Sequence, residues 1–213
     1  MIENTKKNYY LKLALIVLAV AGFGLLLWKF DFDILFFIQD HIRNSVLDVI
    51  VPFYTSLGED GIIWIVVGVA MLIPKKTRKC GATVLLTMAI CYVVGNIGIK
   101  NLIQRPRPCS LDPAVQLLIA IPKEYSFPSG HTLHSFAAAT SIFLQYRKPG
   151  IAALVLASVI AFSRMYLFVH FPTDILGGMI LGIGMAILVY KITGRIRAKK
   201  CHIASVKFYS EIK

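Results

Sequence analysis

The sequence predicts an all-α protein that crosses a membrane six times, with both termini in the cytoplasm and a short amphipathic helix at the membrane interface. Hydrophobic residues make up 57% of the 213 residues and charged residues only 16%, with a mean hydropathy of +0.70, which is typical of membrane proteins. Six apolar stretches approach the roughly 20 residues that cross a bilayer. The basic residues gather on one side of these stretches.

The first apolar stretch, residues 13–28, lies between Lys12 and Lys29, whose long side chains can reach the two interfaces. We interpret it as an anchor, because it lacks the small-residue cleavage site of a signal peptide. The other predicted spans are residues 58–74, 81–99, 129–146, 151–168 and 174–192. The second contains an unbroken apolar stretch of only residues 61–73, so we expect its helix to begin earlier, with Glu59 and Asp60 near the headgroups.

Residues 31–54, between the first two spans, contain apolar residues at helical spacing beside charged ones. This pattern favours an interfacial amphipathic helix. Residues 199–213 are predicted to form a short cytoplasmic tail. Without an internal repeat or a linker in the sequence, we expect one domain over residues 1–213.

The net charge of +12 is explained by membrane topology, and we expect no nucleic-acid partner. With a cytoplasmic N-terminus, six spans place 16 of the 23 basic residues on the inner side, together with only two acidic residues, Glu3 and Glu211. This is the positive-inside asymmetry. The four cysteines are scattered without a metal or redox pattern, so free thiols are expected: Cys80, Cys91, Cys109 and Cys201.

Three polar clusters interrupt the apolar chain, and the predicted topology places all of them on the outer face. The first is Lys100 with Arg105 and Arg107. The second is residues 128–131, which read Pro-Ser-Gly-His. The third comprises Ser163, Arg164, His170 and Asp174.

These clusters resemble in full the three-part signature of the phosphatidic acid phosphatase type 2 superfamily. The first motif, K-x6-R-P, begins at Lys100 and ends at Arg107 and Pro108. The second, P-S-G-H, ends at His131, and the third, S-R-x5-H-x3-D, begins at Ser163. The resemblance covers about residues 58–190. It implies a membrane-embedded phosphatase that needs no metal and no cofactor.

The resemblance assigns a role to each motif residue. His170 is the expected nucleophile, His131 the general acid and base, and Asp174 the group that orients His170. Phosphate is expected to bind to Lys100, Arg107, Ser129, Gly130 and Arg164. Arg105 and Ser163 are possible auxiliary residues. The chemistry fits, because phosphoryl transfer is promoted mainly by fixed cations and hydrogen-bond donors around the phosphate.

Other conspicuous residues are expected to be structural. These are His41, His134 and His202, the interface aromatics Trp28, Tyr54, Trp64 and Tyr166, and the glycines of the last span, which include the GxxxG pair Gly178 and Gly182. Residues 110–127 are compatible with either a lid or a lipid-contacting hairpin.

A site at the outer interface of a cell membrane predicts a lipid phosphate as the substrate. Undecaprenyl pyrophosphate is the preferred candidate, and phosphatidylglycerophosphate or phosphatidic acid is the alternative. A function of another class is also considered, namely a non-catalytic protein that binds or transports lipid phosphates.

Overall fold

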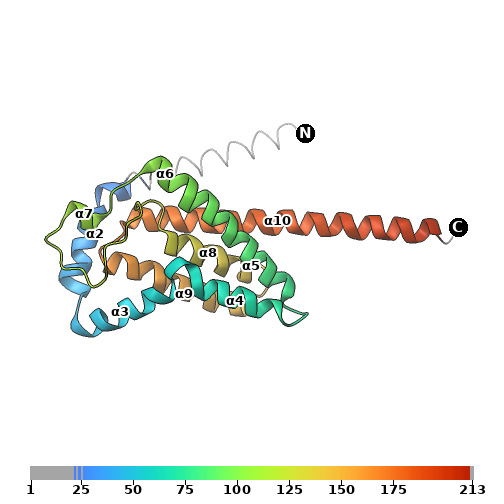
Figure 1. The fold of residues 1–213 in the computed structure, drawn as a ribbon, viewed down its shortest axis with the longest axis horizontal. Coiled ribbons are helices and arrows are strands. Elements are labelled where there is room, and N and C mark those ends of the chain that lie inside the picture. The colour runs from blue at the N-terminus through green and yellow to red at the C-terminus, as the bar shows by residue number, and fades with distance from the viewer. Residues whose placement is uncertain (1–21, 23, 25, 212–213) are drawn as a thin grey trace.

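The computed structural model describes residues 22, 24 and 26–211 of the chain (Figure 1). Within this part the chain forms helices joined by turns and loops, without a β-strand. The first predicted span lies largely outside the described residues. The all-helical prediction is confirmed for the remainder of the chain.

The first half of the described chain runs through α2 (Asp31–Phe37), a π-helical turn (Ile38–Ile42), α3 (Ser45–Leu57), a 3₁₀ turn (Glu59–Gly61) and α4 (Ile62–Leu72). Next comes one long helical segment that consists of α5 (Arg78–Cys91), a π-helical stretch (Tyr92–Ile99) and α6 (Lys100–Ile103). The second half contains α7 (Pro108–Leu111), α8 (Gly130–Phe143), α9 (Arg147–Tyr166) and α10 (Pro172–Glu211).

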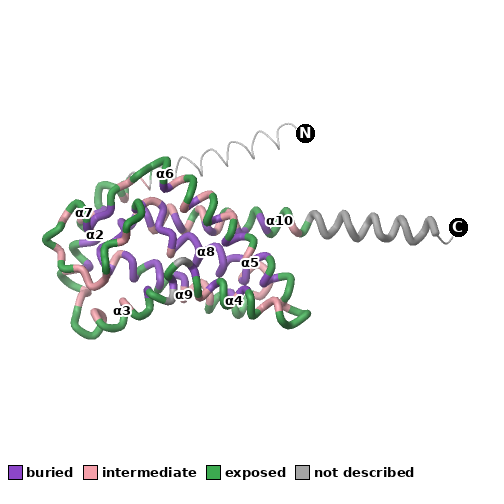
Figure 2. Tube along the Cα trace, viewed as in Figure 1, coloured by how far each residue is buried: buried purple, intermediate pink, exposed green. Residues whose placement is uncertain are grey.

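Helix α8 is the centre of the bundle and packs against α5, α9 and α10, with nearly all its residues buried (Figure 2). The predicted GxxxG pair makes this packing possible. A Cβ on Gly178 would meet the carbonyl oxygen of Ser129 at 2.8 Å, and one on Gly182 would meet that of Leu133 at 2.5 Å. The two glycines therefore let the backbones of α10 and α8 approach closely, as expected.

Three described helical segments are long and apolar enough to cross a membrane: residues 78–111, 147–166 and 172–194. The second and fourth predicted spans contain shorter helices, α4 with 11 residues and α8 with 14. Helix α8 is enclosed by protein, so it carries Thr132, Ser135 and Ser141 without exposing them to lipid. Six crossings and the side of each terminus stay predictions.

Residues 31–54 do not form the single amphipathic helix that the sequence predicted, because the helix is interrupted between the π-helical turn and α3. The chain is extended at Arg43 and Asn44, and the Asn44 side chain accepts hydrogen bonds from the backbone of Val46 and Leu47 to begin α3. Leu35 and Ile38 are buried in a cluster with residues 166–169 and 171. The first part of this region therefore belongs to the protein core, whereas Val46, Val49 and Phe53 of α3 are exposed.

Two of the predicted interface aromatics are also core residues. Trp64 is 2% exposed and donates a hydrogen bond of 2.8 Å to Ser135, and Tyr166 is 1% exposed and donates one of 2.8 Å to Asp48. The predicted tail is helical as far as Glu211, because α10 continues through it.

The two loops with predicted inner basic residues, one between α4 and α5 and the other between α8 and α9, lie together at one end of the bundle. The Tyr146 hydroxyl, between α8 and α9, donates a hydrogen bond of 2.7 Å to the carbonyl of Lys76, between α4 and α5. Helix α8 begins with Gly130 and His131 at the opposite end (Figure 1). The residues of the three motifs meet at that opposite end.

Candidate active site

His170 lies in a short connection between α9 and α10 that is buried throughout. Leu167, Phe168, Val169 and Phe171 are each at most 3% exposed, and His170 is 2% exposed. Phe168 has a left-handed φ of 58°, which is rare for a bulky residue and persists only where the surroundings enforce it. The apolar neighbours thus fix the backbone that presents His170.

The two ring nitrogens of His170 face different groups. Arg107 Nη1 lies 3.0 Å from Nε2, while Asp174 Oδ2 lies 3.5 Å and Ser126 Oγ 3.4 Å from Nδ1. A guanidinium can only donate, so Nε2 carries no proton and accepts this hydrogen bond with its lone pair. The neutral ring therefore carries its proton on Nδ1, beside Asp174.

The charge state of His170 follows from its surroundings. Burial lowers the pKa of its imidazole well below the usual value, and the positive charges of Arg107, Arg164 and Lys100 lower it further. The imidazole is thus neutral at physiological pH. A neutral ring with an unprotonated Nε2 is the form that can act as a nucleophile.

Arg107 is fixed by backbone carbonyls from two loops. Its Nε donates to the carbonyl of Glu124 at 2.7 Å, and its Nη1 also donates to that of Val169 at 2.9 Å. The side chain is buried. Its orientation is thus set before any ligand binds, which suits a cation that binds phosphate.

Lys100 lies at the end of the π-helical stretch, and its ammonium forms an ion pair with the Glu124 carboxylate. Lys100 is buried, whereas the Glu124 side chain is 60% exposed. The hydrogen bond from Lys100 lowers the pKa of the Glu124 carboxyl. Residues 119–124 form one wall of the site, so part of the 110–127 segment lines the cavity.

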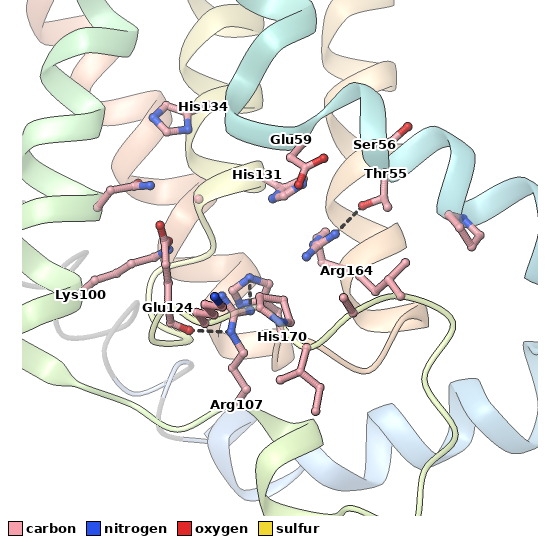
Figure 3. Close-up of a pocket in the computed structure, with 18 residues that line it drawn as sticks. Thr55, Ser56, Glu59, Lys100, Arg107, Glu124, His131, His134, Arg164 and His170 are labelled. Atoms are coloured by element: carbon pink, nitrogen blue, oxygen red, sulfur yellow. Dashed lines mark hydrogen bonds and ion pairs between the residues drawn. The ribbon is translucent and has the colours of Figure 1, made fainter.

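These groups surround a cavity of about 430 Å³. Figure 3 shows Arg107 and His170 on one side, Lys100 and Glu124 on another, and His131 with Arg164 opposite. Arg164 Nη1 donates to Thr55 Oγ1 at 2.6 Å, while its buried Nε has no hydrogen-bond partner within the described structure. The cavity therefore gathers three cations and two motif histidines.

The structure brings six predicted site residues to the cavity wall: Lys100, Arg107, Gly130, His131, Arg164 and His170. Ser129 lies behind this wall. Its backbone N–H donates to the carbonyl of Asp174 at 3.2 Å, and its hydroxyl accepts from Thr132 at 3.1 Å. The Ser129 groups expected to bind phosphate are thus engaged within the protein.

Ser163 and Arg105 also lie outside the cavity lining. The Ser163 hydroxyl donates to the carbonyl of Ile160 at 2.6 Å. Arg105 forms ion pairs of 2.6 Å with both Asp31 and Asp174, and its guanidinium lies 4.1 Å from the centre of the Phe171 ring. Its place is behind Asp174, away from the expected phosphate.

Sequence reasoning missed several residues of the site. Asp31, Thr55, Ser126 and Glu124 lie outside the three motifs, and only the fold brings them to the motif residues. Asn96 and His134 line the cavity as well. The π-helical stretch that carries Asn96 is a feature often found at functional sites, but the sequence pattern does not reveal it. His134, expected to be structural, also stacks near Tyr92.

No group of three or more His, Cys, Asp or Glu side chains that could hold a metal occurs among the described residues. Cys80, Cys91 and Cys109 are free, as expected, and the structure shows that they are also buried. The three cations and two motif histidines that line the cavity are chemically suited to bind a phosphate group. A helical membrane protein with this combination of cations and histidines belongs to the class of phosphate-transferring hydrolases.

Comparison with known proteins identifies the family. The sequence matches the PAP2 superfamily over residues 81–198, more than half of the chain. It is 30% identical over 199 residues to an undecaprenyl-diphosphatase of Sulfolobus acidocaldarius, covering 90% of this chain and 96% of that protein. A decaprenylphosphoryl-5-phosphoribose phosphatase of Mycobacterium tuberculosis is 33% identical over 153 residues, covering 68% and 81%.

The fold agrees with this assignment. The crystal structure of a transmembrane PAP2-type phosphatidylglycerolphosphate phosphatase from Bacillus subtilis superposes with a TM-score of 0.65 at 26% identity, covering 84% of this chain and 96% of that one. The chain belongs to the PAP2 superfamily. It is a membrane-embedded lipid phosphatase.

Proposed function

We propose that this protein hydrolyses undecaprenyl pyrophosphate, or a closely similar polyprenyl pyrophosphate, through a phosphohistidine at His170. The observation that carries the chemistry is the pair of contacts on one ring: Arg107 at Nε2 and Asp174 beside Nδ1. The two relatives described above are named for undecaprenyl and decaprenyl lipids. A long-chain polyprenyl carrier is therefore the preferred substrate.

In the proposed reaction, Nε2 of His170 attacks the terminal phosphorus and forms a nitrogen–phosphorus bond. The bond from phosphorus to the leaving oxygen breaks, and His131, which the proposal requires to be in its imidazolium form when the phosphate anion is bound, donates a proton to that oxygen and becomes neutral. A water molecule then attacks the phosphohistidine and gives its proton to His131. The nitrogen–phosphorus bond breaks, inorganic phosphate leaves, and both histidines return to their starting states.

The cations around the cavity have a defined part in this scheme. Lys100, Arg107 and Arg164 are proposed to bind the phosphate oxygens and to stabilise the charge that develops in the transition state. Gly130 opens α8 at the cavity wall, where backbone N–H groups and the helix dipole favour an anion. With three fixed cations, the scheme requires no metal ion.

The site is proposed to face the extracytoplasmic side of the cell membrane. This proposal is supported by the positive-inside asymmetry of the sequence, which predicts that most basic residues lie on the inner side. The loops that carry Lys76 and Tyr146 lie at the end of the bundle opposite His131. This arrangement supports a site that receives its lipid from the outer leaflet.

Phosphate release from purified protein in detergent tests this proposal. Undecaprenyl pyrophosphate, phosphatidylglycerophosphate and phosphatidic acid are compared at equal surface concentration, with EDTA present. We expect turnover of all three without metal and the highest kcat/KM for the pyrophosphate. His170→Ala is expected to abolish turnover, whereas His41→Ala, which changes an exposed histidine, is expected to retain it.

Each alternative predicts a different result. Preference for phosphatidylglycerophosphate, the substrate named for the Bacillus subtilis structure, would assign the chain to glycerolipid metabolism. Saturable lipid binding without phosphate release by the wild-type protein would favour the non-catalytic binding or transport function. Substantial turnover by His170→Ala would contradict the proposed nucleophile.

A further inference from the structure

The guanidinium of Arg105 joins two buried carboxylates that are far apart in the sequence. Its Nη2 lies 2.6 Å from Asp31 Oδ2, and its Nη1 lies 2.6 Å from Asp174 Oδ1. The Asp31 and Asp174 side chains are 3% and 0% exposed, and that of Arg105 is 17% exposed. Such a shared guanidinium fixes the position of the two carboxylates relative to each other.

Asp31 has a second set of contacts at the beginning of α10. Its Oδ1 accepts a hydrogen bond of 3.0 Å from the backbone N–H of Thr173, and its Oδ2 accepts one of 2.5 Å from the Thr173 hydroxyl. The same hydroxyl accepts a hydrogen bond of 2.7 Å from Arg105. Asp31 therefore fixes the first turn of α10, which carries Asp174.

The other carboxylate oxygen of Asp174 faces the reacting histidine. Asp174 Oδ2 lies 3.5 Å from Nδ1 of His170 and accepts hydrogen bonds from the Ser126 hydroxyl at 2.5 Å and the Phe171 N–H at 2.9 Å. A continuous series of polar contacts thus runs from Asp31 through Arg105 and Asp174 to His170.

We propose that Asp31 is a positioning residue of the active site, which holds Asp174 beside His170 through the shared guanidinium of Arg105. The inference rests on the proposed role of His170 as nucleophile. Asp31 lies in α2, outside residues 81–198 that match the family. It therefore adds an element to the site that the motif residues do not contain.

Asp31 can affect the position of Asp174 because both carboxylates share the hydrogen-bond donors of Arg105. With Asp31 present, each carboxylate receives one arm of the guanidinium. Without that carboxylate, Arg105 is free to turn toward Asp174 and to compete with Nδ1 of His170 for its oxygens. The imidazole then loses its fixed orientation, and a displacement of even 1 Å at a reacting group is enough to slow a reaction about 10²-fold.

The test compares Asp31→Asn with Asp33→Asn. Both changes remove one carboxylate from α2, but Asp33 is exposed. Asp31→Asn keeps an oxygen for the Thr173 N–H and is nearly the same shape. We expect it to lower kcat about 10-fold to 100-fold with little change in KM, while Asp33→Asn matches the wild type.

A double-mutant cycle with Arg105→Gln separates positioning from general destabilisation. If Asp31 acts through Arg105, Asp31→Asn has no further cost in the Arg105→Gln background, or it restores activity by removing an unpaired buried carboxylate. Values of kcat are taken per mole of folded protein, quantified by gel filtration in detergent. Multiplicative losses in the cycle would overturn the inference, as would a wild-type kcat for Asp31→Asn.

The outcome is distinguishable from failure of the proposed function. An inactive wild-type protein contradicts the phosphatase proposal itself. An active wild-type protein, with an inactive His170→Ala and a fully active Asp31→Asn, contradicts only the role of Asp31. A rise in KM at constant kcat would also overturn it, because that change points to substrate binding and not to orientation of the nucleophile.

Discussion

Arg107 donates a hydrogen bond of 3.0 Å to Nε2 of His170, the nitrogen proposed to attack phosphorus. This contact fixes both the tautomer and the direction of the nucleophile. It also places a cation where the attacked phosphoryl group must bind. Phosphate that enters the cavity can take the Arg107 N–H for its own oxygens and free the Nε2 lone pair for attack.

The shape of Arg107 is therefore expected to matter as much as its charge. Arg107→Lys keeps the positive charge but loses the fork that bonds the carbonyls of Glu124 and Val169. We expect kcat/KM to fall about 10²-fold or more, measured as phosphate release. Arg78→Lys, an exposed change at the opposite end of the bundle, serves as the control. Near-wild-type activity of Arg107→Lys would show that charge alone suffices.

Burial of neutral His170 predicts a dependence of stability on pH. Its pKa is lowered in the folded protein, so below the unfolded value of about 6.5 the unfolded chain binds more protons. The contribution of neutral His170 to the free energy of unfolding is therefore fully present well above about pH 6.5 and is lost progressively as the pH falls below that value. At pH 5.5 the loss from this group is about 1 kcal/mol.

Thermal unfolding in detergent at pH 8 and pH 5.5 checks this prediction. Because other groups titrate in the same range, the relevant quantity is the difference between the wild type and His170→Gln. We expect the loss of Tm on acidification to be smaller in the variant. An equal or larger loss would mean that His170 is not held neutral by its surroundings.

The sequence predicted the helical class, the family and the six residues of the cavity wall that belong to motifs. It did so because a phosphoryl-transfer site constrains residue type and spacing strongly. The residues that hold the catalytic side chains in position were harder to predict. Asp31 was assigned to an interfacial helix, and Arg105 was named only as a possible auxiliary residue, because hydrophobic periodicity does not indicate which polar residues meet after folding.

The length of the helix in the fourth predicted span was overestimated for a related reason. Residues 129–146 are apolar enough to suggest a full span, yet α8 has only 14 helical residues. Its environment is other helices, so average hydropathy does not report contact with lipid. Trp64 and Tyr166 were similarly assigned to the interface, although each has a buried hydrogen-bond partner, Ser135 and Asp48 respectively.

The contact between α8 and α10 provides a stability test with a matched control. A Cβ on Gly182 would lie 2.5 Å from the carbonyl oxygen of Leu133, whereas one on Gly184 meets nothing within 4 Å. We expect Gly182→Ala to destabilise the protein by about 1–3 kcal/mol. Gly184→Ala is expected to be neutral or slightly stabilising because alanine favours helix. Equal Tm values for the two variants would contradict the close packing.

The orientation in the membrane can be tested with single cysteines. Cys80, Cys91 and Cys109 are each at most 4% exposed, so they are poor targets for a thiol reagent, and a Cys201→Ser background removes the remaining thiol. Ala114→Cys lies in the exposed loop on the cavity side, and Lys76→Cys lies at the opposite end. In intact cells, an impermeant maleimide is expected to label position 114 but not position 76. The reverse pattern would invert the topology.

The most direct test of the phosphatase mechanism is the location of the covalent phosphate. Protein mixed with a polyprenyl pyrophosphate labelled in its terminal phosphate is quenched in alkali, which preserves phosphohistidine. Peptide mass spectrometry identifies the residue, and ³¹P NMR identifies the ring nitrogen. The proposed mechanism predicts phosphate on Nε2 of His170, because Nδ1 faces Asp174. Phosphate on Nδ1, on His131 or on any other residue would contradict it.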